Sequence, residues 1–131
     1  MDGNGVRILV ADGCDETRQL LTQVLALHDY NVHVAEDGAD VLRQMNTRRY
    51  DVIIINDRLP GLTSPEFSAL CQTEWPESSI VVLSPPKSEL AELALQHGAY
   101  ARICKPCDLM VLLQTVRAAT KRRYRSSQET R

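Results

Sequence analysis

The chain has 131 residues, of which 44% are hydrophobic and 24% charged, a balance typical of a globular domain with one hydrophobic core. No apolar run approaches the roughly 20 residues that a membrane span needs, and the polar start at residues 1–5 does not resemble a signal peptide. We therefore expect a cytoplasmic protein with no membrane partner.

The formal net charge of −2 is unevenly distributed along the chain. Residues 121–131 have five basic side chains and one acidic side chain, so the preceding part of the chain is acidic. An acidic body without a basic stripe argues against nucleic-acid binding by this domain itself. The change of charge predicts one domain over residues 1–120 and a basic tail or linker over residues 121–131.

The first third of the chain predicts two strands, each followed by a helix. Val6–Ala11 is the first strand, and Asp15 is a candidate N-cap of the helix after it. Apolar or boundary residues of this helix recur three and four positions apart, at Leu20, Leu21, Val24, Leu25 and His28. Asn31–Ala35 alternates as an edge strand does. A short helix is predicted over Asp37–Asn46, with Val41, Leu42 and Met45 facing inward.

The strongest strand signal lies in the middle of the chain. Val52–Ile55 is a run of four β-branched residues, which is typical of a strand covered on both faces at the centre of a parallel sheet. Asn56 and Asp57 follow it directly. After a Pro-Gly turn, the next helix is predicted to begin with Ser64 as its N-cap and Pro65 in its first position.

The last third of the chain repeats this alternation. A fourth strand, Ile80–Leu83, ends at Ser84, and Ser88 is the predicted N-cap of a helix that ends at Gly98. Ala101–Cys104 is the fifth strand, and Lys105 follows it. Asp108 then caps a final helix, whose predicted buried side comprises Leu109, Leu112, Leu113 and Val116.

Five strands alternating with five helices predict an α/β fold, a parallel sheet with right-handed crossovers and helices on both faces. In open sheets of this kind, functional groups lie just beyond the carboxyl ends of the strands. We therefore expect Asp12, Ser84 and Lys105 to converge with the Asn56-Asp57 pair. A carboxylate, a hydroxyl and an ammonium group together outline a site for a phosphoryl group and Mg²⁺.

The order and spacing of these groups resemble the receiver domain of two-component response regulators, over about residues 6–120. The matching segments are Ile8–Asp12, Ala35–Gly38, Tyr50–Asn56, Leu59–Gly61, Val82–Ser84, Gly98-Ala99 and Lys105-Pro106. The resemblance implies a flavodoxin-like, doubly wound fold with strand order 2-1-3-4-5. It also implies an aspartate at the end of the third strand that accepts a phosphoryl group from a histidine kinase.

In that family, two acidic residues after the first strand help to bind Mg²⁺, and a Ser or Thr and a Lys contact the phosphate. This chain departs from the pattern, because counting back four residues from Pro60 gives Asn56 in place of the acceptor aspartate. An amide cannot carry a phosphoryl group as an acyl phosphate. The second acidic position is Gly13, and the aromatic switch position on the fifth strand is Arg102. Asp12 alone predicts weak Mg²⁺ binding at most, and we expect no other cofactor.

These departures predict a degenerate receiver, or pseudo-receiver, that is not an enzyme and acts as a phosphorylation-independent protein-interaction module. Lys105 is expected to pair with Asp12 or with the Asn56 side-chain oxygen, which would hold the site in one conformation. Side chains alternate at a strand end, so Asp57 should point away from the pocket as a solvated loop carboxylate.

Two alternative functions remain at this point. The first is a phosphorylatable receiver that uses Asp57 with Mg²⁺, or an aspartate at position 56 if the asparagine was introduced. The second is a thiol redox sensor, because Cys104 and Cys107 have the Cys-x-x-Cys spacing.

The resemblance also implies the location of the partner surface, on the fourth helix, the fifth strand and the last helix. Met110 and Val111 widen the apolar arc of the last helix beyond what one sheet face needs. We expect a homodimer or a docked protein partner there, a histidine kinase as a candidate partner, and an output domain after residue 121.

Overall fold

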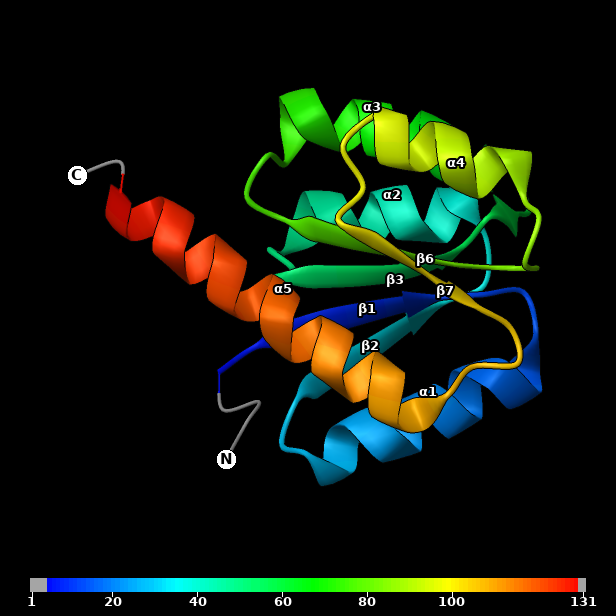
Figure 1. Cartoon of the computed structure of the whole chain (residues 1–131), viewed down its shortest axis with the longest axis horizontal. Helices are drawn as coiled ribbons and strands as arrows, with labels where there is room; N and C mark the ends of the chain where they lie inside the picture. The colour runs from blue at the N-terminus through cyan, green and yellow to red at the C-terminus, as the bar shows by residue number, and fades with distance from the viewer. Residues whose placement is uncertain (1–4, 130–131) are drawn as a thin grey trace.

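The computed structural model describes the backbone of residues 5–129 and the side chains of residues 5–121. Five parallel strands form one twisted sheet (Figure 1) in the order β2-β1-β3-β6-β7. They span Arg7–Ala11 (β1), Asn31–Ala35 (β2), Val52–Asn56 (β3), Ser79–Ser84 (β6) and Ala101–Cys104 (β7). The predicted strand order is therefore confirmed, with the four-residue apolar run at the centre of the sheet.

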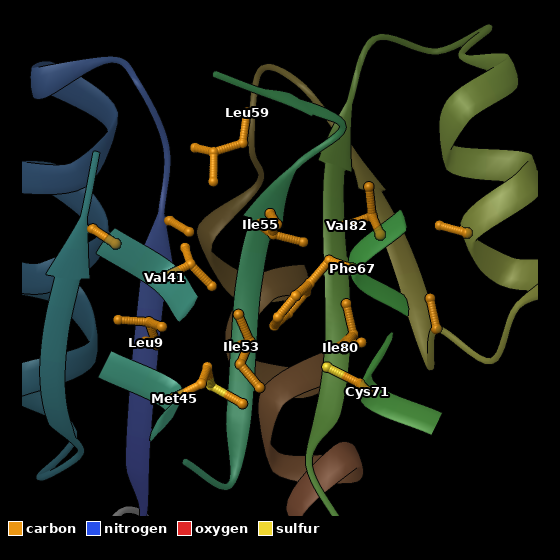
Figure 2. Packing of buried hydrophobic residues seen from close by; sticks show 14 of the residues in the cluster. Leu9, Val41, Met45, Ile53, Ile55, Leu59, Phe67, Cys71, Ile80 and Val82 are labelled. Atoms are coloured by element: carbon orange, nitrogen blue, oxygen red, sulfur yellow. The ribbon is translucent and has the colours of Figure 1, made fainter. Parts of the chain in front are cut away.

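Helices cover both faces of the sheet, as predicted (Figure 1). One face packs against α1 (Asp15–Leu27) and α5 (Leu109–Glu129), and the other packs against α2 (Gly38–Thr47), α3 (Ser64–Glu74) and α4 (Glu89–Gln96). Successive residues of β3 enter opposite cores, because side chains alternate along a strand. Ile53 and Ile55 lie in the same core as Phe67 of α3 (Figure 2), whereas Val52 and Ile54 lie in the other.

A short antiparallel hairpin follows β3, where the sequence indicated only a turn. It consists of β4 (Arg58–Leu59) and β5 (Leu62–Thr63), joined through Gly61, whose φ of +81° favours glycine. The hairpin packs against the start of α2, where a Cβ on Gly38 would lie 2.5 Å from the Leu62 Cβ. A strand of two residues is too short to show an alternating pattern of polar and apolar residues, so the sequence did not predict this hairpin.

Two of the predicted helix caps are wrong by one residue. Cys14, not Asp15, is the N-cap of α1, and the Asp15 carboxylate pairs with Arg18 instead. Thr63, not Ser64, is the N-cap of α3, and it forms a capping box with Glu66. The other two predicted caps, those of α4 and α5, are confirmed: Ser88 accepts from the Ala91 N–H (3.1 Å), and Asp108 accepts from the Met110 N–H (2.9 Å).

The buried face of α1 differs from the predicted one. Leu20 is 46% exposed, whereas Arg18 is buried with Leu21 and Leu25. These three residues follow the same three-and-four spacing, so the helix is rotated relative to the expected face. The guanidinium of Arg18 donates a hydrogen bond to the Asp12 carbonyl. This bond helps to compensate for the burial of a charged side chain.

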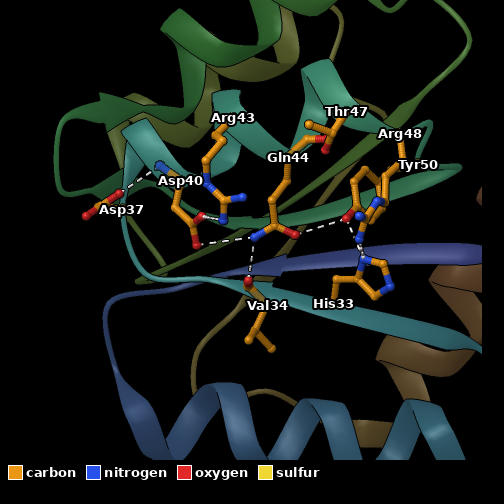
Figure 3. Close-up of polar contacts among 9 residues, drawn as sticks. All are labelled: His33, Val34, Asp37, Asp40, Arg43, Gln44, Thr47, Arg48 and Tyr50. Atoms are coloured by element: carbon orange, nitrogen blue, oxygen red, sulfur yellow. Dashed lines mark hydrogen bonds and ion pairs between the residues drawn. The ribbon is translucent and has the colours of Figure 1, made fainter.

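A polar network joins the edge strand β2 to α2 and to Tyr50, which precedes β3 (Figure 3). Tyr50, which is fully buried, donates from its hydroxyl to Gln44 Oε1 (3.0 Å) and lies 2.6 Å from His33 Nδ1. Gln44 Nε2 donates to the Val34 carbonyl (2.7 Å). Arg48 Nη1 is also 3.0 Å from His33 Nδ1.

α5 continues from Leu109 to Glu129, so the predicted domain boundary after residue 120 lies within a helix. The division into domain and tail stays a prediction, and the tail side chains from residue 122 onward lie outside the described residues. No helix in the described part of the chain is long and apolar enough to cross a membrane.

Candidate functional site

Asp12, at the end of β1, is the centre of the site and is only 1% exposed. Its Oδ2 accepts a hydrogen bond from Lys105 Nζ at 2.9 Å, and its Oδ1 accepts one from the Cys14 N–H at 2.9 Å. The predicted pairing of Lys105 with Asp12 is confirmed. The alternative, a bond from Lys105 to the Asn56 oxygen, is absent from the described hydrogen bonds.

Asn56, the last residue of β3, points its amide toward Asp12. Its Nδ2 is 3.4 Å from Asp12 Oδ1, and its Oδ1 lies 3.5 Å from the Arg58 N–H. β1 and β3 are neighbours, with Ala11 opposite Ile55, so the residues that follow these two come together at the sheet edge. The amide therefore occupies the predicted acceptor position at the tip of the central strand.

Asp57 points away from Asp12 and Lys105, as strand alternation predicted, but it is not solvated. It is 4% exposed, and its Oδ2 accepts a hydrogen bond from the Ser88 hydroxyl at 2.6 Å. The expectation of a solvated loop carboxylate is therefore wrong, because the N-terminus of α4 covers this side of the strand end. The sequence identified Ser88 as a helix cap, but nothing in it placed that hydroxyl beside a residue 31 positions earlier.

The remaining predicted residues are engaged with other parts of the fold. Ser84 is fully buried at the end of β6, and its hydroxyl donates to the Pro85 carbonyl at 3.0 Å. Arg102, at the predicted switch position on β7, donates from Nη1 to Glu92 Oε1 of α4 at 2.7 Å. Neither side chain has a described bond to Asp12 or Lys105.

Mg²⁺ does not fit the residues present. Asp12 supplies one carboxylate, and both of its oxygens already accept hydrogen bonds. Gly13 offers no side-chain ligand, and Glu36 lies beside the Arg18 guanidinium at 3.8 Å. Among the described residues, no group of three His, Cys, Asp or Glu side chains could bind a metal ion. A site with a lysine ammonium on its one carboxylate lacks the oxygen ligands that Mg²⁺ prefers.

The cysteines are all free thiols in different environments. Cys104 is exposed, with Arg102 Nη2 3.9 Å from its sulfur. Burial, reinforced by the Asp108 carboxylate, raises the pKa of the Cys107 thiol. Cys14 is exposed beside Asp12, and hydrogen bonds from Thr17 lower the pKa of its thiol. The redox alternative for Cys104 and Cys107 stays untested.

The order of the strands and the placement of Asp12, position 56 and Lys105 at their carboxyl ends define a receiver-type domain. The family model of the response regulator receiver domain matches residues 8–117, and the chain belongs to this family. It is thus a receiver domain of a response regulator in two-component signalling.

Relatives and solved structures agree with this assignment. The chain is 30% identical over 118 residues to the response regulator MprA of Mycobacterium ulcerans, covering 89% of this chain and 51% of the relative. The chain spans about half the length of the curated relatives it matches. Its structure is similar to the signal receiver domain of an HD domain-containing protein from Pseudomonas fluorescens (27% identity, TM-score 0.86, covering 91% and 97% of the two chains). It is also similar to the chemotaxis response regulator CheY4 of Vibrio cholerae (26% identity, TM-score 0.80, covering 87% and 98%).

Proposed function

We propose that this receiver domain does not accept a phosphoryl group and acts as a phosphorylation-independent protein-interaction module. The observation that supports the proposal is the filled site: an amide stands at the acceptor position, and Lys105 is paired with the one remaining carboxylate, Asp12. The ammonium that would meet an incoming phosphate already has a buried partner. Such a site stays in one conformation, and it catalyses no reaction.

The alternative acceptor, Asp57, is disfavoured by its surroundings. Attack on phosphorus needs a free carboxylate oxygen within reach of the phosphoryl donor. The Asp57 carboxylate is buried and bonded to Ser88, on the side of the strand end away from Lys105. A donor would have to displace the start of α4 to reach it.

The proposed partner surface comprises α4, β7 and the first turns of α5. Leu93 on α4 is 43% exposed, and Met110 and Val111 on α5 are 65% and 43% exposed. Exposed apolar side chains next to polar ones are typical of protein interfaces. We propose that a second copy of the domain or a different protein docks there. An output domain and a histidine kinase are the candidate partners. We further propose that the protein acts in the cytoplasm.

The test is incubation with acetyl phosphate and Mg²⁺, followed by intact mass measurement. The unmodified chain should gain no phosphoryl group under conditions in which Asn56→Asp gains one. The Asn56→Asp variant is a matched control, because it changes one side-chain atom and keeps the shape of the site. A phosphoryl adduct on the unmodified chain, mapped to any residue of the site, would contradict the proposal.

A further inference from the structure

We propose that Asp57 is a positioning residue that tethers the N-terminus of α4, and so fixes the α4–β7 face of the domain in one position. This goes beyond the proposed function and rests on it in one respect, namely that no phosphoryl group arrives at position 56 to move α4. The tether uses the carboxylate next to the lost acceptor position.

Asp57 is bonded to three neighbouring elements at once. Its backbone N–H donates to the Leu83 carbonyl of β6 at 2.9 Å, and its carbonyl accepts from the Ser64 N–H of α3 at 3.0 Å. Its carboxylate accepts from Ser88 at 2.6 Å. The two backbone bonds fix the residue against the ends of β6 and α3. The carboxylate is therefore a hydrogen-bond acceptor at a fixed place.

The Ser88 hydroxyl links this fixed acceptor to α4. A hydroxyl has a single proton, and Ser88 donates it to Asp57, which turns the lone pairs toward the helix. One lone pair accepts from the Ala91 N–H at 3.1 Å, so the same hydroxyl caps α4. The chain of bonds Asp57–Ser88–Ala91 also places a carboxylate near the positive end of the helix dipole. Each bond in such a chain polarises and strengthens the next.

A second contact holds α4 from the solvent side. Arg102 on β7 bonds to Glu92 Oε1 at 2.7 Å and to the Pro86 carbonyl, in the link before α4. The Glu92 side chain is largely exposed, and exposed ion pairs contribute little. The buried bond to Asp57 is thus the stronger of the two, because losing it leaves a buried carboxylate without that donor.

Amide hydrogen exchange followed by NMR on the full chain tests the tether. Loss of a buried hydrogen bond to a carboxylate predicts that amides in the first turns of α4 exchange about 10- to 100-fold faster in Asp57→Ala and in Ser88→Ala. Amides of β1 and β3 should keep their protection, which reports that the domain is folded.

The double variant should exchange no faster than Ser88→Ala alone, because the tether acts through the Ser88 hydroxyl. Glu89→Gln is the matched control, since it removes an exposed carboxylate from the same helix end, and it should speed α4 exchange by no more than a few-fold through the helix dipole.

Asp57→Ala separates the tether from the cap, because it removes the carboxylate and leaves the Ser88 hydroxyl in place to accept from the Ala91 N–H. The proposal predicts faster exchange in α4 of Asp57→Ala despite the intact cap, whereas a cap without a tether predicts no change. Unchanged α4 exchange in Asp57→Ala would overturn the tether alone. A phosphoryl adduct on the unmodified chain would overturn the proposed function, and the exchange result would still decide the tether.

Discussion

Lys105 and Asp12 are 93 residues apart in the sequence, and the lysine ammonium lies 2.9 Å from the buried aspartate oxygen. Removing the ammonium leaves a carboxylate that is 1% exposed with only its two N–H donors. Breaking a buried pair costs about 3–5 kcal/mol, and the partial exposure of Lys105 reduces the expected loss. We expect Lys105→Met to lower the free energy of unfolding by about 1–3 kcal/mol in urea titrations. Lys87→Met, at an exposed position, should leave it unchanged; equal stability of the two variants would contradict the role given to the pair.

Restoring the missing carboxylates should restore the chemistry of the family. A Cβ on Gly13 would meet nothing closer than the Pro60 Cδ at 3.5 Å, so an aspartate fits at this position. In Asn56→Asp/Gly13→Asp, the two added carboxylates attract the cation, which competes with the Lys105 ammonium for the Asp12 carboxylate. We expect the double variant to bind Mg²⁺ at least about tenfold more tightly than Asn56→Asp, measured by calorimetry, since nearby charges interact by several kcal/mol. We also expect it to gain a phosphoryl group faster from acetyl phosphate. Equal Mg²⁺ affinity in the two variants would show that position 13 does not face the site.

The stability of the domain should fall in mildly acidic solution because of His33. Burial and the positive charges of Arg48 and Arg7 lower the pKa of His33 below its ordinary value of 6.5. As the pH falls, the unfolded chain therefore binds more protons than the folded chain does. The contribution of His33 to the stability of the fold is thus complete above about pH 6.5 and is lost below it. The midpoint of urea unfolding should decrease between pH 7.5 and pH 5, and by a smaller amount in His33→Gln. His97→Gln, at an exposed position, serves as the control and should retain the full decrease.

The four thiols should react with iodoacetamide in a fixed order. Hydrogen bonds from Thr17 lower the pKa of exposed Cys14, whereas burial raises the pKa of Cys71 to about 12. Because the thiolate is the reactive form, Cys14 should be alkylated first and Cys71 last at pH 7.5, as mapped by peptide mass spectrometry. Thr17→Val should slow the reaction of Cys14 several-fold and leave Cys104 unaffected. A mass loss of two hydrogens on mild oxidation, mapped to Cys104 and Cys107, would instead favour the redox-sensor function.

Self-association should depend on the apolar residues of α5. Met110 is 65% exposed and lies on the first turn of the helix, so replacing it does not disturb the core. We expect a concentration-dependent dimer in sedimentation experiments, and Met110→Asp should weaken it at least about tenfold by burying a charge at the contact. Leu27→Asp, at an exposed position on α1, is the matched control. A monomer at all concentrations would exclude the homodimer and leave a different protein as the partner.

The sequence alone determined the five-stranded parallel sheet and placed Asn56 at the end of its central strand. These features depend on local patterns of residues, namely the apolar run of β3 and the alternation of strand and helix signals along the chain. The strand order and the predicted acceptor position came from the resemblance to receivers. The structure confirms the strand order, and it places Asn56 at the tip of β3 beside Asp12.

Only the tertiary structure decided which side chains pair. Asp57 was expected in solvent, yet it is buried against Ser88, and Lys105 had two candidate partners before the fold placed it on Asp12. Arg18 replaced Leu20 on the buried face of α1 because a carbonyl of the strand end lies within its reach. Hydrogen bonds between residues 31 and 93 positions apart depend on how helices lie over the strand ends, and no local pattern of residues records that geometry.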